Sequence, residues 1–125
     1  MEQKKLEWNE KIKLDSDRLV ELFVQLGETG AQDVVCRAME ELATRLCQLE
    51  REYQARKFKS LCKLAKGIIG IAEQVGMQRL ADVARDVQQC AKRYDYVALD
   101  ATLARLLRIG DSSLTAVWDL QDLSV

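Results

Sequence analysis

The chain has 125 residues, of which 48% are hydrophobic and 31% charged, and its formal net charge is −1 at pH 7. This length and balance predict one globular domain over residues 1–125 with a single core. A net charge near zero, without a long block of like charge, argues against binding to DNA or RNA. Proline is absent and aromatic residues make up 6% of the chain, which favours helices over strands.

No apolar run reaches the length of a membrane span, and the first residues lack the apolar region of a signal peptide. We therefore expect a cytoplasmic protein. The four cysteines, Cys36, Cys47, Cys62 and Cys90, form no Cys-x-x-Cys pair, and the chain contains no histidine. They are expected to be small, buried, reduced side chains, and no zinc site is predicted.

The first half of the chain predicts two helices. Residues 1–13 are highly charged and are interpreted as a loose lead-in or as a helix that packs late. Capping residues at 15–17 begin a helix that ends at the glycines of 27–30. A second helix follows from about Gln32, and a weakly marked turn is placed at 51–56, where neither Gly nor Pro occurs.

The second half continues the pattern. A third helix is predicted over about 55–75 with Gly76 as its stop, and a fourth over about 78–92. After a turn at 94–96, a final helix either kinks or restarts at 110–113. Trp8 and Trp118 are interpreted as side chains that cover the domain's own ends or anchor an interface. Together these elements predict an all-α, antiparallel up-and-down four-helix bundle with a short extra N-terminal helix.

The third helix is amphipathic. At 100° per residue its apolar side chains gather on one side, while the opposite flank carries Lys59, Lys63, Lys66, Gly70 and Glu73. Lysines on a helix flank usually form a solvated face. A glycine in mid-helix costs about 1 kcal/mol relative to Ala, so Gly70 needs a reason, either tight helix packing or close approach of a partner. Ile69 lies at the border, as core edge or as an exposed contact.

The stretch 61–84 resembles the core of a histidine-containing phosphotransfer (HPt) domain. That family's motif reads roughly Ala-His-x-Leu-Lys-Gly, with a second glycine six residues on and a new amphipathic helix behind it. The matching positions are Ala65, Gly70, Gly76 and the run Leu80–Ala84, with Ile68 at the leucine position. Two positions depart from the motif: Lys66 stands at the phosphorylated histidine and Ile69 at the lysine. The same bundle with a short N-terminal helix is what the resemblance implies.

The departure at Lys66 implies that the family's chemistry is lost. Imidazole is nucleophilic when neutral near pH 7 and forms a labile phosphoramidate, whereas an exposed lysine ammonium stays protonated and is a poor nucleophile. The function that the resemblance still implies is binding to a partner protein. The implied partner is the receiver domain of a response regulator or a histidine kinase of a two-component system. The implied contact residues are Lys59, Lys63, Lys66, Ile69, Gly70 and Glu73.

Two other interpretations stay open. One is a structural or scaffolding helical bundle that acts by self-association or by protein binding unrelated to a phosphorelay. The other is phosphotransfer through a residue other than histidine. A serine or cysteine nucleophile would lack a histidine base, and no glycine-rich phosphate loop or paired-carboxylate motif occurs. We therefore expect no enzyme activity, no cofactor and no metal, and the sequence leaves the oligomeric state open.

Overall fold

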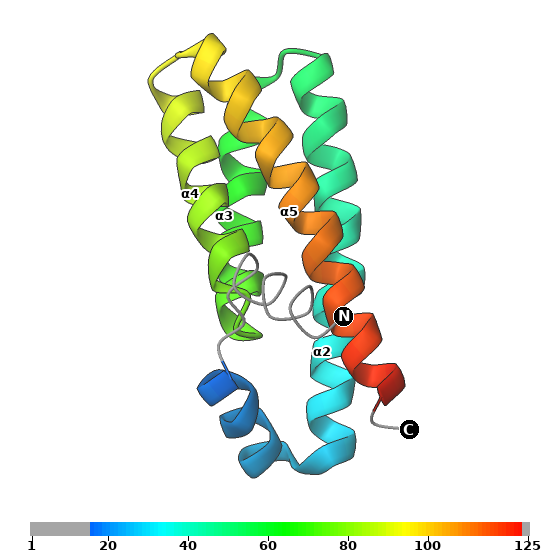
Figure 1. The fold of residues 1–125 in the computed structure, drawn as a ribbon. Helices are drawn as coiled ribbons and strands as arrows, with labels where there is room; N and C mark the ends of the chain where they lie inside the picture. The colour runs from blue at the N-terminus through cyan, green and yellow to red at the C-terminus, as the bar shows by residue number, and fades with distance from the viewer. Residues whose placement is uncertain (1–15, 124–125) are drawn as a thin grey trace, which may run out of the picture.

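The computed structural model describes residues 16–123, and within them the side chains of residues 17–115. The helices are α2 (Ser16–Gln54), α3 (Phe58–Gln74), α4 (Gln78–Lys92) and α5 (Tyr96–Leu123). They run alternately up and down, so that each is antiparallel to the next (Figure 1). α3 packs between α2 and α4, and α5 closes the bundle against α4 and α2. The predicted all-α four-helix bundle is confirmed.

The core is formed by the apolar side that each helix turns inward. In α3 this side consists of Leu61, Ala65, Ile68 and Ala72, all without solvent exposure. They recur at three- and four-residue intervals, which is the helical period that the sequence shows. Fully burying a side chain such as Leu61 contributes about 1.5–3 kcal/mol. This anchoring fixes the rotation of α3 and therefore decides which of its residues face solvent.

A sharp bend divides α2 at Gly27. This residue has φ 75° and ψ 175°, which interrupts the helix between a short segment, 16–26, and a long segment, 28–54. The short segment lies across the lower end of the bundle (Figure 1). There the Arg18 guanidinium donates to the Gln74 carbonyl, 2.9 Å away, and so caps the C-terminal end of α3. The predicted short N-terminal helix is thus present, but the long segment resumes directly after Gly27 rather than at Gln32.

The three interhelical turns share one geometry. Arg56 takes φ 59°, and the N–H groups of Arg56 and Lys57 donate back to carbonyls in the last turn of α2. The same pair of hydrogen bonds ends α3 around Gly76, with φ 78°, and α4 around Tyr94, with φ 54°. This pattern is the Schellman motif, in which the left-handed residue is usually glycine. A turn is present, but it lies at 55–57 rather than over 51–56, because α2 continues to Gln54, and Arg56 carried no signal for it.

The last helix shows why one expectation was wrong. α5 runs through residues 110–113 without the predicted kink or restart. Gly110 is buried instead, and a Cβ there would stand 2.6 Å from Leu46 Cδ1. The glycine therefore serves close packing of α5 on α2. No helix in the described part of the chain has the length and hydropathy needed to cross a membrane.

Some predictions lie outside the described residues or fail within them. The lead-in at 1–13, Trp8 and the Trp118 side chain fall outside them. All four cysteines are free, but none is fully buried, and Cys47 is exposed. The expectation of buried cysteines is therefore wrong for Cys47, because this position of α2 faces outward rather than toward α3 or α5.

Candidate docking surface on α3

The side of α3 opposite the core faces solvent. Lys59, Lys63, Lys66, Gly70 and Glu73 are all exposed there and are called the α3 stripe below. Ile69 is partly buried and packs against the core. The structure therefore places five of the six predicted contact residues on one open helix face and the sixth, Ile69, at the edge of the core.

The two central glycines of α3 have opposite surroundings. Among the described residues a Cβ at Gly70 would meet nothing within 4 Å, so packing between the described helices does not explain this glycine. At Gly67 a Cβ would stand 2.5 Å from Nη1 of Arg45, which reaches across from α2. The close helix contact therefore belongs to Gly67, and the approach of a partner stays a prediction for Gly70.

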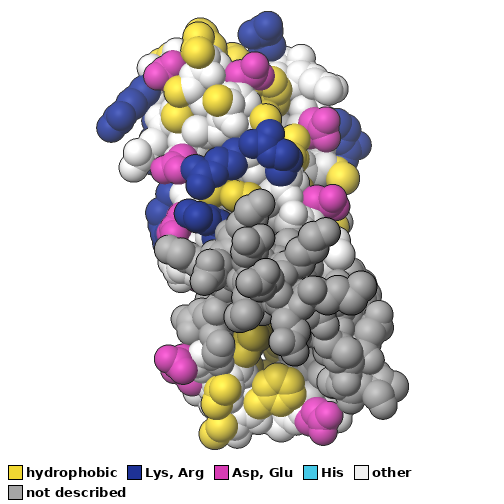
Figure 2. All heavy atoms as spheres, viewed as in Figure 1, with side chains coloured by type: hydrophobic (Ala, Val, Ile, Leu, Met, Phe, Trp, Pro, Cys, Tyr) yellow, Lys and Arg dark blue, Asp and Glu magenta, His cyan; other side chains and the backbone are white. Residues whose placement is uncertain are grey.

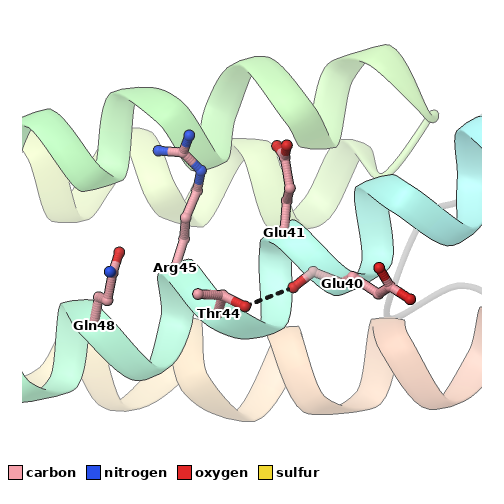
Figure 3. Close-up of a pocket in the computed structure, with 5 residues that line it drawn as sticks. All are labelled: Glu40, Glu41, Thr44, Arg45 and Gln48. Carbon is pink, nitrogen blue, oxygen red and sulfur yellow. Dashed lines mark hydrogen bonds between the residues drawn. The ribbon is translucent and has the colours of Figure 1, made fainter.

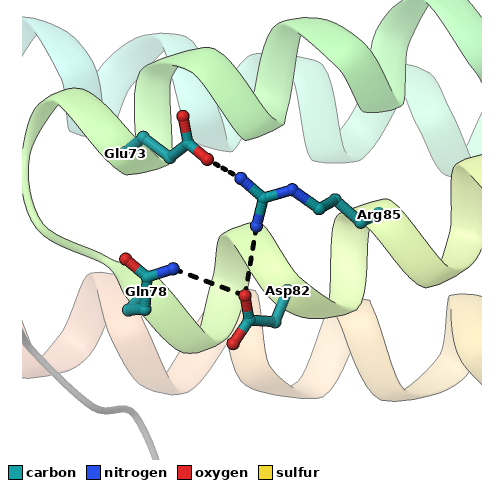
Figure 4. A network of polar contacts seen from close by, with 4 residues as sticks. All are labelled: Glu73, Gln78, Asp82 and Arg85. Atoms are coloured by element: carbon teal, nitrogen blue, oxygen red, sulfur yellow. Dashed lines mark hydrogen bonds and ion pairs between the residues drawn. The ribbon is translucent and has the colours of Figure 1, made fainter.

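One end of the α3 stripe is tied to α4. Glu73 forms an ion pair with Arg85, whose Nη1 also lies 3.1 Å from Asp82 Oδ1 (Figure 4). Gln78 Nε2 donates to the same Asp82 oxygen across 3.4 Å. These side chains are partly exposed, so the network contributes modestly to stability. The network also changes the charge of the surface, because Arg85 neutralises Glu73, the one carboxylate of the α3 stripe.

The rest of the stripe is positively charged. Lys59, Lys63 and Lys66 form no ion pair with any described carboxylate, and the first turn of α3 contains no acidic residue. The N-terminal end of a helix itself carries partial positive charge. The exposed half of α3 that contains the lysines is therefore a cationic surface with an open backbone patch at Gly70.

A groove extends this surface toward α4. It has a volume of about 350 Å³ and is lined by Phe58, Lys59, Cys62, Lys63, Ala91, Lys92 and Tyr94. Its lining is mostly apolar, and its charged lining residues are all lysines. The sequence did not predict it, because Lys92 and Tyr94 are brought beside the start of α3 by the antiparallel return of α4.

Arg45 is the second feature that the sequence did not reveal. Its side chain and that of Glu41 both point toward α3 (Figure 3). Together with Glu40, Thr44 and Gln48 of the same helix they line a surface hollow of about 410 Å³. The available signal was Gly67, a second mid-helix glycine three residues before Gly70. A mid-helix glycine indicates that a neighbouring group comes close to the α3 backbone, but it does not identify that group as Arg45.

The arrangement of lysines around the open backbone at Gly70 supports binding of an anionic surface.

No group of three or more Cys, Asp or Glu side chains is placed to hold a metal ion anywhere in the described part of the chain. Comparison of the chain with family models, curated proteins and solved structures gives no match.

Proposed function

We propose that the protein is a non-catalytic, HPt-like docking protein of a two-component phosphorelay. It binds the receiver domain of a response regulator and modulates it without transferring phosphate. A histidine kinase is the alternative partner of the same class. The observation that carries the proposal is the combination, on one face of α3, of three lysines that pair with no described carboxylate and the open backbone at Gly70. The lysines are Lys59, Lys63 and Lys66.

Charge complementarity favours the receiver domain. A receiver's phosphorylation pocket is a cluster of carboxylates at the surface, to which three exposed ammonium groups are attractive. Opposite charges across an interface speed association and select the partner more than they add affinity. The open backbone at Gly70 allows a partner loop to come close to α3, since no side chain among the described residues stands in the way.

Lys66 occupies the position at which the resemblance expects the phosphoryl carrier. A protonated ammonium there attracts an acidic pocket but does not accept a phosphoryl group. The implied effect on the receiver is competition or sequestration, because docking occupies the surface that a true phosphotransfer domain would use.

The test is a binding panel. Purified receiver domains and kinase dimerisation domains of the same organism are titrated calorimetrically with the wild-type chain and with Lys66→Glu. At least one receiver should bind, and Lys66→Glu should weaken binding about tenfold or more at low salt, where screening is weakest. Arg105→Glu on α5, diagonal to α3, is the matched charge-reversal control. If no member of the panel binds, or if both variants weaken binding equally, the proposal fails.

A second candidate function is favoured by a different surface. Hydrophobic side chains gather at the lower end of the molecule, over the short segment of α2 (Figure 2). Val20, Phe23, Val24 and Leu26 are exposed there, Val24 by 79%. Such a patch is typical of a protein-binding site. It favours the scaffolding alternative, in which the protein associates with itself through this segment.

A further inference from the structure

Gly67 and Arg45 form a close contact between α3 and α2. A Cβ at Gly67 would stand 2.5 Å from Nη1, 3.2 Å from Cζ and 3.7 Å from Nε of Arg45. The guanidinium therefore lies against the α3 backbone in space that any other residue would fill. A glycine within a helix costs about 1 kcal/mol relative to Ala. Gly67 therefore lowers the stability of α3, and its structural effect is to leave room for the Arg45 guanidinium.

The seated guanidinium has no anionic partner among the described residues. Arg18 and Arg85 each pair with carboxylates, whereas Arg45 forms neither an ion pair nor a hydrogen bond there. Glu41, one helical turn earlier on α2, points the same way but does not form an ion pair with it (Figure 3). Arg45 is partly buried, and its forked N–H donors, which have no partner among the described residues, suit a planar pair of oxygens.

The contact between Arg45 and Gly67, called the Arg45 seat below, lies beside the α3 stripe. Gly67 directly follows Lys66, lies one turn after Lys63 and precedes Gly70 by three residues. Residues three and four apart are neighbours on a helix surface. Arg45 therefore adds a guanidinium from α2 to the ammonium groups of α3, on the side of the open backbone that faces α2.

We propose that Arg45, seated on Gly67, is the anion-binding group of the docking surface and takes two oxygens of a carboxylate or phosphoryl group. The inference rests on the proposed function for the source of these oxygens, the acidic phosphorylation pocket of a receiver domain. Lysine supplies a point charge, whereas a forked guanidinium also fixes the orientation of the bound anion. Arg45 thereby sets how the receiver is oriented on α3.

The first experiment needs no protein partner. The Arg45 Nε–Hε signal is assigned in ¹⁵N spectra by its loss in Arg45→Gln, and the wild type is titrated with inorganic phosphate and with acetate against sodium chloride of equal ionic strength. The signal should shift saturably with phosphate, acetate or both, and the two arms separate phosphoryl from carboxylate preference. Gly67→Ala retains every charge and favours the helix, yet its methyl group displaces the guanidinium. It should weaken that binding at least about fivefold. An equal response in wild type and Gly67→Ala overturns the inference, as does a response no larger than that to chloride.

The second experiment uses the receiver that binds the wild type. Arg45→Gln and Gly67→Ala should each lower its affinity about tenfold, while Arg105→Gln on α5 should change it less than about twofold. Thermal melts should show Gly67→Ala folded and no less stable than the wild type. If Lys66→Glu weakens receiver binding but Arg45→Gln and Gly67→Ala do not, the inference fails and the proposed function stands. If no receiver binds although the phosphate response depends on Gly67, anion binding at the Arg45 seat is supported and the proposed function fails.

Discussion

The Tyr53 hydroxyl donates a hydrogen bond to the Asp100 carboxylate and so joins the end of α2 to the start of α5. α2 and α5 are the least extensively packed of the neighbouring helix pairs, and this bond adds a polar link between them. The hydrogen bond to Asp100 raises the pKa of Tyr53 above its ordinary value of 10.0, and partial burial and the negative charge of Asp100 act in the same direction.

Tyr53→Phe should lower the free energy of unfolding by about 0.5–1.5 kcal/mol at pH 7, the usual net value of one such bond. The raised pKa means that the folded state holds the Tyr53 proton more tightly than the unfolded state. Its stabilising effect is therefore complete below pH 10 and is lost as the pH rises through the folded-state pKa. Urea unfolding of both proteins at pH 7 and above pH 10 measures this. The difference between them should shrink at the higher pH, and a difference that grows would contradict the assignment.

Arg56→Gly should stabilise the protein by about 0.5–1 kcal/mol, because Arg56 has a left-handed backbone, φ 59°, that glycine adopts without the Cβ penalty. Arg56→Ala removes the same charge but keeps the Cβ, so it serves as the control and should give no gain. Chemical denaturation of the three proteins decides the matter. Equal stability of the Gly and Ala variants would mean that the turn carries no strain.

These turns also show how far sequence reasoning reached. Gly76 predicted the end of α3, and a fourth helix over 78–92 is confirmed as Gln78–Lys92, because glycine is the expected residue in a left-handed cap. Arg56 and Tyr94 hold the same backbone geometry without any compositional signal. Their turns are imposed by the bundle, whose tertiary packing outweighs local preference.

Glycine plays two different roles at these positions. The break at Gly27 followed from its backbone freedom, but Gly110 and Gly67 are close-packing positions. Helical periodicity predicted that the α3 stripe faces solvent, because that follows from the position of the apolar residues on the same helix. It could not predict Arg45 or the groove at Lys92, since both depend on which side chain a neighbouring helix brings alongside.

Restoring the motif should restore phosphorylation only when both departures are reversed. The wild type should take no label from a phosphorylated receiver or kinase. Lys66→His supplies an imidazole but leaves Ile69 where the resemblance expects a lysine, so we expect weak labelling. Lys66→His/Ile69→Lys should be clearly labelled, since the ammonium helps to neutralise the phosphoryl group. Gel autoradiography under alkaline conditions measures each. A folded double variant that binds the receiver yet stays unlabelled would contradict the alignment with the family motif.

The scaffolding alternative makes its own prediction about the short segment of α2. If the exposed patch there joins two copies, the wild type should associate as its concentration rises, and Val24→Lys should keep it monomeric. Val97→Lys is the matched control, because Val97 is 84% exposed but lies at the start of α5. Sedimentation equilibrium of the three proteins is the measurement. A wild type that stays monomeric at high concentration removes the self-association form of this alternative.

The central claim is that the α3 stripe is the surface that a receiver domain contacts. Titration of the ¹⁵N-labelled protein with the receiver, followed through its backbone amide signals, tests this claim residue by residue. The account predicts that the largest shifts and the strongest line broadening fall between Lys59 and Glu73, with Gly70 among the most affected, and that Gly70→Arg abolishes them while the protein stays folded. Changes confined to α5 or to residues 17–26, with α3 unaffected and Gly70→Arg binding like the wild type, would contradict it.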